Sequence, residues 1–458
     1  MTPIRTKRKQ NRSSLSFWSY PPSLILAERP LLTTRLKADL AERKQLRGPS
    51  SLQFAIADRI GFLDGASWDS VANGQSVFLS RGYLAMLEGA CPENLEPRYA
   101  LIFRAGKPVA AVVMQIVTVT PDRLRKRKEA EDKQRGGVRQ MLSKLARPIA
   151  AGLAAGLNDV ARQRIVVCGN LLSFGFHAVA FAEGEDRAPL WHAVTEVLYR
   201  VRRAEKLAGQ TSFVIVKDLP AGEMKASQPL GKLSYQKVDT EPDMVLAVDP
   251  AWKRYDDYLA SLASKYRSAV KQQILKPMNA AGCVVERLAD VDAHRGRVHA
   301  LYLQVHANAA LRPVTLPDVY FPALARFGGD RVRYAAVRRG DELLGFLVTL
   351  KDGATAIAYH IGFDRQAAEG LPIYLRLLHA GIADAIDMGC SRISFGRTAL
   401  EPKARLGARP DPMSVWVRHR QPVLNALIRD LLGGVHHDEA PERNPFKTAV
   451  AGATQDGT

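Results

Sequence analysis

The sequence predicts two consecutive α/β domains, and three observations support this fold class. The chain has 458 residues, which is more than a single hydrophobic core usually organises. Strand-like and helix-like segments alternate along both halves. The order of these segments in residues 51–249 recurs in residues 283–438, as expected for an internal repeat.

The first half opens with an alternating strand pattern at residues 52–57. Two helical patterns follow at 65–73 and 78–89, and Ser76 is a plausible cap for the second. The remaining predicted elements are a hairpin at 99–119, strands at 164–167 and 176–181, a helix at 190–208 that ends at Gly209, and a buried strand at 213–216.

The second half repeats this order. A strand is predicted at 283–286, followed by helices at 296–309 and 319–327. Next come a three-stranded meander at 332–337, 343–350 and 355–361, a helix at 371–388 that ends at Gly389, and a short strand at 392–395.

Four other segments complete the predicted organisation. The N-terminus is basic and the C-terminus is rich in small and polar residues, so both ends are expected to be flexible. Helical spacing of apolar residues indicates a linker helix between the halves. The predicted segments are a basic flexible leader at 1–50, a basic insert at about 121–160, a connecting helix at 250–282 and a flexible tail at 439–458.

The net charge of +19 and the pI of about 9.9 favour anionic partners. Nucleotides, coenzyme A, tRNA, anionic lipids and nucleotide sugars all fit, and a basic solvated surface explains the charge equally well. The four cysteines are Cys91, Cys168, Cys283 and Cys390. Their spacing fits neither a disulfide framework nor a zinc site, so we expect reduced thiols and no metal. We expect a cytoplasmic protein, because reduced thiols fit that compartment best, and no apolar run is long enough to span a membrane.

Several stretches resemble known proteins. Residues 264–271 (SKYRSAVK) are similar to the Lys/Arg-bearing helix that opens the second domain of FemAB-like proteins. Residues 394–398 (SFGRT) resemble a late strand ending in Phe-Gly, and 399–408 (ALEPKARLGA) resemble the helix that follows it. Residues 77–84 (VFLSRGYL) resemble the start of the first domain. Together, and in this order along the chain, these stretches resemble the GNAT (acyl-CoA N-acyltransferase) superfamily, in its tandem FemAB-like or CelD-like branch.

The resemblance implies an α+β layered fold of two tandem GNAT-like domains, each a mixed, mostly antiparallel sheet flanked by helices. It also implies an N-acyltransferase or aminoacyltransferase that acts on an amine of a cell-envelope or polysaccharide precursor. Residues 283–438 would form the catalytic domain. An acetyl-CoA-dependent GNAT enzyme of unknown substrate and a non-catalytic scaffold that binds anionic membrane or nucleic acid are the alternatives.

The sequence does not decide whether the acyl donor is acyl-CoA or aminoacyl-tRNA. GNAT enzymes that use acyl-CoA hold the pyrophosphate with a Q/R-x-x-G-x-G/A loop at a helix N-terminus. Residues 362–370 (GFDRQAAEG) lack this pattern, and residues 134–137 (QRGG) resemble it only weakly. FemAB-like enzymes, which take aminoacyl-tRNA, also lack the loop.

The resemblance implies a reactive centre where the fourth and fifth strands of the second domain part. Tyr359 and His360 lie on one wall and are candidate proton relays. Strand alternation predicts that only one of them faces the cleft. Phe395, Gly396 and Arg397 form the other wall, and the glycine permits a close backbone approach.

Basic residues near this centre are candidates for binding an anionic donor or substrate. Arg397, Lys403 and Arg405 follow the fifth strand and can bind phosphate. Lys265 and Arg267 on the connecting helix can reach the domain cleft. A solvated helix face is the competing interpretation for all of them.

Residues 123–153 combine many basic residues with an apolar stripe. This pattern is typical of a helix that lies on an anionic membrane, which would make the protein membrane-peripheral. It also fits RNA contact or packing on the first domain. Nucleic acid is expected as a partner only if the donor is a tRNA, and the sequence does not indicate an oligomeric state.

Overall fold

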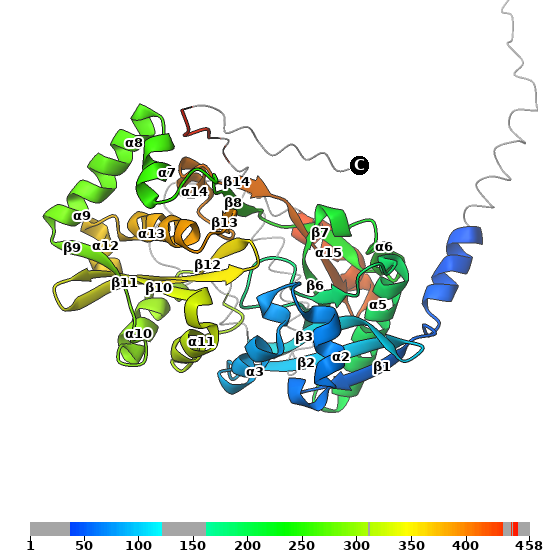
Figure 1. Ribbon diagram of the computed structural model, residues 1–458. Helices are drawn as coiled ribbons and strands as arrows, with labels where there is room; N and C mark the ends of the chain where they lie inside the picture. The colour runs from blue at the N-terminus through cyan, green and yellow to red at the C-terminus, as the bar shows by residue number, and fades with distance from the viewer. Residues whose placement is uncertain (1–36, 121–161, 310–311, 434–440, 442, 448–458) are drawn as a thin grey trace, which may run out of the picture. The chain divides into compact units, whose positions relative to one another are not determined.

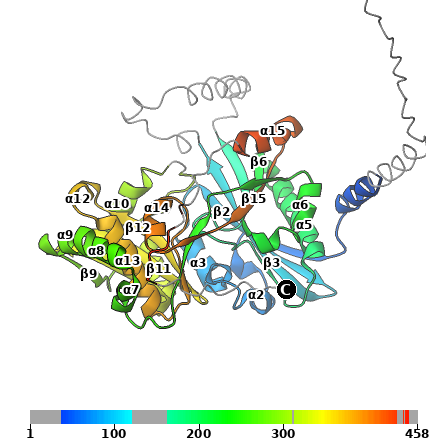
Figure 2. The same ribbon diagram turned by 90° about the horizontal axis from the view of Figure 1, so that it is seen from above.

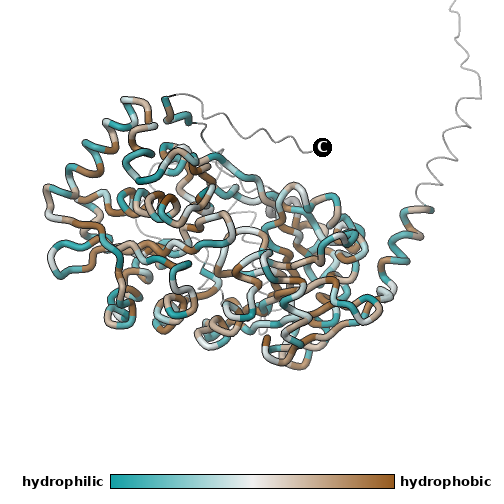
Figure 3. The backbone as a smooth tube through the Cα atoms, in the orientation of Figure 1, coloured by the Kyte–Doolittle hydropathy of each residue, from teal (hydrophilic) through white to brown (hydrophobic). Residues whose placement is uncertain are grey.

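A computed structural model of the chain describes residues 37–120, 162–309, 312–433, 441 and 443–447. The predicted insert at about 121–160 therefore lies outside the described residues. The chain divides into two units, Met1–Gly48 and Pro49–Thr458. In the first unit, residues 37–46 form a helix within the segment predicted to be a flexible leader, and Figure 3 shows that this helix is mainly hydrophilic. The second unit contains both predicted domains.

The first β-sheet of this unit has eight strands. Seven follow the order β1-β2-β3-β4-β6-β15-β7, and β5 pairs with β3. All pairs are antiparallel except β4 with β6. The strands are β1 (Gln53–Ala57), β2 (Leu95–Arg104), β3 (Lys107–Val119), β4 (Gln163–Cys168), β5 (Val179–Phe181), β6 (Thr211–Pro220), β7 (Gln236–Asp239) and β15 (Met413–His419).

The second sheet has seven strands in the order β14-β8-β13-β12-β11-β10-β9. Its only parallel pair is β12 with β13. The strands are β8 (Asp243–Ala247), β9 (Cys283–Arg287), β10 (Val332–Arg339), β11 (Glu342–Asp352), β12 (Thr355–Phe363), β13 (Arg392–Ser394) and β14 (Arg409–Asp411). Both sheets are thus mixed and mostly antiparallel, as the family resemblance implies.

Two strands lie in the sheet of the other half. β8 follows the first half in sequence but pairs with β13 and β14 of the second sheet. β15 follows the second half but lies between β6 and β7 of the first sheet, and Figure 2 shows it running beside β6. The predicted domains at 51–249 and 283–438 therefore differ from the two sheets by one strand each. Pairing between such distant segments leaves no local signal in the sequence.

Helices cover both faces of each sheet. The first half contains η1 (Ile60–Phe62), α2 (Gly65–Ala72), η2 (Val77–Leu79), α3 (Arg81–Gly89), α5 (Arg187–Ala204), η4 (Glu205–Leu207), η5 (Ala221–Glu223) and α6 (Gln228–Lys232). The second half contains α10 (Arg295–His306), α11 (Tyr320–Gly328), η7 (Gly329–Arg331), α12 (Arg365–Gly370), α13 (Ile373–Asp387), α14 (Leu400–Arg405) and α15 (Pro422–Gly433). Figure 1 shows α10 and α11 on one face of the second sheet and α13 on the other.

One hydrophobic core is shared by both halves. Trp68 and Tyr83 from the first half are fully buried in the same cluster as Tyr320 and Phe321 from the second. Apolar burial of this kind is the main stabilising contribution to a fold. The two sheets are therefore fixed relative to each other by side-chain packing as well as by the exchanged strands.

The connecting segment is helical but interrupted. It consists of α7 (Tyr255–Ser261), α8 (Ser264–Val270), a π-helical turn η6 (Lys271–Leu275) and α9 (Lys276–Ala280). The interruption follows Ser261, where the N–H of Ala263 donates to the carbonyl of Pro445 and Leu262 forms a β-bridge with Phe446. Part of the predicted flexible tail is therefore bound to the linker.

Candidate active site

The strands β12 and β13 part in the second sheet. They pair only between Thr355–Ile357 and Arg392–Ser394. The chain after β13 then follows β8 instead, because the N–H of Phe395 donates to the carbonyl of Met244. Within the described part of the chain, the later residues of β12 therefore have no strand partner on this side. The structure thus contains the parting of strands on which the predicted reactive centre depends.

A β-bulge in β12 brings Tyr359 and His360 to the same face. Val348 pairs with His360, but the next residue, Thr349, pairs with Ala358, so Tyr359 is the extra residue. The Tyr359 and His360 ring centroids are 4.0 Å apart. The prediction that only one of the two faces a given side is wrong, because the bulge interrupts the strict alternation of the strand.

Tyr359 is part of a buried hydrogen-bond network between the halves. Its hydroxyl lies 2.8 Å from that of Tyr83 and 2.9 Å from that of Tyr320. Asn170 donates from Nδ2 to the Tyr83 hydroxyl. Tyr359 is only 4% exposed, and burial raises its pKa well above the ordinary value. This geometry gives Tyr359 a role in joining the halves, while the proton relay expected of it stays a prediction.

His360 lies in a buried, aromatic environment that disfavours its charged form. Burial lowers its pKa to about 3, and its Nε2 atom is buried without a hydrogen-bond partner among the described residues. The rings of Tyr320 and Phe321 lie 5.5 Å and 5.8 Å from it, edge-on. An unpartnered neutral nitrogen next to the parting strands can accept a proton or a hydrogen bond.

The first half contributes to the opposite wall. Gly396 has φ of 71°, and a Cβ atom there would lie 2.9 Å from the Phe174 ring, so only glycine fits. The guanidinium of Arg397 forms an ion pair with Asp218, a fully buried residue of β6. Burial lowers the pKa of Arg397 to about 10. Arg397 therefore points toward the first half, where its charge is already balanced.

Lys403 holds the loop after β13. Its Nζ donates to the carbonyl of Gly396 at 2.9 Å and to that of Arg397 at 2.6 Å. The next two loop residues, Thr398 and Ala399, have φ of 66° and 48°, a strained conformation for residues other than glycine. Lys403 is 3% exposed, and burial lowers its pKa to about 8. It is thus a support for the wall, and the expected direct contact with an anionic donor does not fit its burial.

The other predicted cations occupy ordinary surface positions. Lys265 is exposed on α8. Arg267 donates to the carbonyl of Ala260 at 3.2 Å, and Arg405 pairs with Glu401 across one helical turn at 2.9 Å. Among the described residues, no hydrogen bond or ion pair connects these three to the parting strands.

Arg376 on α13 is a candidate that the sequence analysis missed. It lies in the first turns of a helix that packs on β12 and β13. No ion pair joins it to a carboxylate of the described residues; burial lowers its pKa and Tyr255 raises it. A half-buried guanidinium near a helix N-terminus favours an anionic ligand. An arginine in a helix usually lies on a solvated face, so its sequence position gave no signal.

The corresponding parting in the first sheet is bridged. There, β4 and β6 pair in parallel up to Cys168 and Val216. The next residue of β6, Lys217, donates from Nζ to the carbonyl of Ser173 at 2.7 Å. Burial and the nearby Arg397 lower the pKa of Lys217 well below its usual value. This bridge leaves the second sheet as the better candidate for a reactive centre.

Comparison with known proteins identifies the type of domain that contains this part of the second sheet. Residues 264–404 match the family model described as the acetyltransferase (GNAT) domain. This part of the chain is a GNAT domain. It extends from α8 to α14 and includes the parting of β12 and β13. The first sheet repeats the strand order of the GNAT domain, so the chain contains two tandem GNAT-like folds, and the family match supports an acyltransferase.

Solved structures with a similar arrangement have little sequence in common with this chain. A crystal structure of FemX has a TM-score of 0.46 and 10% identity, covering 83% of this chain and 99% of its own. A tandem GNAT protein from the clavulanic acid biosynthesis pathway has a TM-score of 0.46 and 11% identity, covering 81% and 99%. The C-terminal domain of a putative lysylphosphatidylglycerol synthetase from Agrobacterium fabrum has a TM-score of 0.37 and 11% identity, covering 58% and 80%. No curated protein matches the chain.

Two kinds of feature are absent from the described residues. They contain no group of three or more His, Cys, Asp or Glu side chains arranged to hold a metal ion. Within the same residues, no helix combines the length and apolar character that crossing a bilayer requires. The segment 123–153, expected to contact an anionic membrane, lies outside them.

Proposed function

We propose that this protein transfers an acyl group from a phosphate-bearing donor to an amine, at the parting of β12 and β13. The observation that carries this proposal is that the parting lies inside the matched GNAT domain. Acyl transfer to an amine needs hydrogen-bond donors for the developing oxyanion and a group that accepts the proton. The unpaired edge of β12 offers backbone N–H groups for the first task. The unpartnered nitrogen of His360 can accept a hydrogen bond from the attacking amine, although its pKa of about 3 makes it a weak base in the free protein.

The donor is proposed to be held by Arg376. Acyl-CoA and aminoacyl-tRNA both carry phosphates, and a guanidinium without a carboxylate partner suits either. The match to a GNAT domain favours acyl-CoA, whereas the absence of the Q/R-x-x-G-x-G/A pattern in residues 362–370 favours aminoacyl-tRNA. We propose an amine of a cell-envelope or polysaccharide precursor as the acceptor.

Binding measurements distinguish the two donors. Acetyl-CoA, free coenzyme A and a mixture of aminoacyl-tRNAs are each titrated against the full chain, and the melting temperature is followed. A ligand bound only by the folded state raises it. The matched variants are Arg376→Ala and Arg405→Ala, because Arg405 is an exposed arginine that pairs with Glu401 on its own helix.

We expect one donor class to bind saturably. A charge-assisted hydrogen bond contributes about 1.5–3 kcal/mol, so Arg376→Ala should weaken donor binding by about tenfold or more, while Arg405→Ala should leave it unchanged. Transfer to an amine acceptor is then measured by mass spectrometry, with His360→Gln as the variant expected to slow it. If neither donor class binds the intact chain, the transferase proposal is wrong and the scaffold alternative is preferred.

A further inference from the structure

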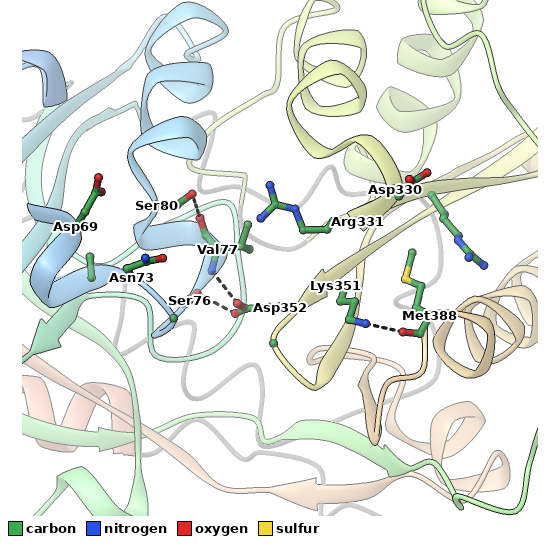
Figure 4. Close-up of a pocket in the computed structure, with 14 residues that line it drawn as sticks. Asp69, Asn73, Ser76, Val77, Ser80, Asp330, Arg331, Lys351, Asp352 and Met388 are labelled. Atoms are coloured by element: carbon green, nitrogen blue, oxygen red, sulfur yellow. Dashed lines mark hydrogen bonds between the residues drawn. The ribbon is translucent and has the colours of Figure 1, made fainter. Parts of the chain in front are cut away.

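A pocket of about 520 Å³ lies between the two halves, away from the parting strands. One side is formed by α2, η2 and the start of α3, and the other by η7, β10, the β11–β12 turn and Met388 (Figure 4). Tyr359, His360 and Arg397 do not line it. It lies at the opposite end of β12 from His360, roughly 15 Å along the strand.

The carboxylates of this pocket already have hydrogen-bond donors or point outward. Asp69 receives bonds from Nε and Nη2 of Arg81. Asp352 accepts from the Ser76 hydroxyl at 2.8 Å and from the Val77 N–H at 2.7 Å. The side chain of the third, Asp330, is fully exposed. Asp69 and Asp352 therefore have little free capacity for a cationic ligand, and Asp330 is paired with Arg287 at 3.7 Å.

The donors of the pocket, in contrast, are in excess. Arg331 extends toward the first-half side of the pocket (Figure 4), and its interaction in the described structure is a cation–π contact with Phe327 at 5.7 Å. Lys351 donates from Nζ to the Met388 carbonyl at 2.5 Å, so two of its three N–H groups are available. The guanidinium of Arg333 is already paired through Nη1 with Asp384 at 3.7 Å and Asp387 at 3.4 Å, so only its buried Nε atom lacks a partner among the described residues.

The walls are already joined to each other. Asp352 of the second half connects to Ser76 and Val77 of the first, and Ser76 is in turn 2.9 Å from Nδ1 of His177. Because these contacts fix the two walls, the pocket exists without a ligand. A preformed concave site with a few convergent polar groups is the usual form of a small-molecule site.

We infer that this pocket binds the oxyanion group of a small metabolite, a carboxylate or a phosphate, through Arg331 and Lys351. Free N–H donors on two cationic side chains of one pocket suit an acceptor-rich, negatively charged ligand. The volume admits a small molecule rather than a polymer. The inference does not rest on the proposed acyl transfer, because none of the candidate transfer residues lines the pocket.

Calorimetry tests this inference: sodium pyrophosphate and sodium citrate are each titrated into the full chain at constant ionic strength. The two probes distinguish a phosphate from a carboxylate as the recognised group. The variants are Arg331→Ala, Lys351→Met and Asn73→Trp; the last fills the pocket from an exposed position without removing a charge. Arg339→Ala is the matched control, because Arg339 is an exposed arginine paired with Glu342 outside the pocket.

We expect at least one probe to bind saturably below about 10 mM. The three pocket variants should weaken it by about tenfold or more, and Arg339→Ala should have no effect. Arg331 and Asn73 are exposed, so their variants should fold, and unchanged melting temperatures verify this. Absence of saturable binding by either probe, or equal binding by Arg331→Ala, Asn73→Trp and the control, would overturn the inference.

Discussion

Replacing Tyr359 by phenylalanine tests whether its hydroxyl joins the two halves or takes part in transfer. The substitution removes one oxygen atom and the hydrogen bonds at 2.8 Å to Tyr83 and 2.9 Å to Tyr320. Tyr83 keeps a bond from Asn170. A buried hydrogen bond contributes about 1 kcal/mol, and an unsatisfied buried hydroxyl costs about 1–3 kcal/mol. We therefore expect the free energy of unfolding to fall by about 1–3 kcal/mol.

Urea denaturation followed by circular dichroism measures this loss from the shift in midpoint at an unchanged slope. Tyr334→Phe is the matched control, since its hydroxyl makes one buried hydrogen bond, at 2.7 Å to the carbonyl of Phe321 within the second half. A cycle of Tyr83→Phe, Tyr359→Phe and the double variant then gives the coupling across the interface. Unaltered stability together with a loss of transfer activity would refute the interface role and identify Tyr359 as a proton relay.

Other residues give three further predictions. Asp218→Asn should lower the free energy of unfolding, measured in urea, by about 2–4 kcal/mol, because it leaves Lys217 and Arg397 without their buried carboxylate. Asparagine tolerates the φ of 57° at this position. A loss below about 0.5 kcal/mol would contradict the prediction. The pKa of His360 is about 3 in the folded protein and about 6.5 in the unfolded chain, so the stability that burial of the neutral ring permits is present at pH 7 and is lost as the pH falls. His360→Gln should therefore reduce the fall in unfolding free energy between pH 7 and pH 5 by about 2 kcal/mol. Identical pH profiles of stability for the variant and the wild type would show that His360 is not buried in neutral form. Charge reversal across residues 123–133 should abolish sedimentation with anionic vesicles if this segment binds membranes, and equal sedimentation of both proteins would exclude that role.

The sequence was informative wherever the signal is local. Glycines at the predicted turns, Gly106 and Gly340, have positive φ and connect antiparallel strands. The helix predicted to end at Gly389 ends at Asp387, and Ser80 rather than Ser76 caps α3. Such elements follow from periodicity and turn chemistry, which neighbouring residues determine.

Features that depend on distant partners could not be predicted. The bulge at Tyr359 appears only in the register of β12 against β11. Asp218, which pairs with Arg397, lies 179 positions away in sequence. The positions of the short strands β8 and β15 depend on pairing with strands of the opposite half. The parting of β12 and β13 was anticipated through the family resemblance, whereas the contribution of the first half to its wall was not.

Because β8 and β15 each complete the sheet of the other half, neither sheet can form fully without both halves. Without β15, β7 would lose its only neighbouring strand in the first sheet, and without β8, β14 would be left alone in the second. A fragment cut between the halves would thus expose unpaired strand edges, which invite aggregation. Assembly requires both halves to be synthesised before either sheet is closed, so co-expressed fragments should recover the fold only as a complex.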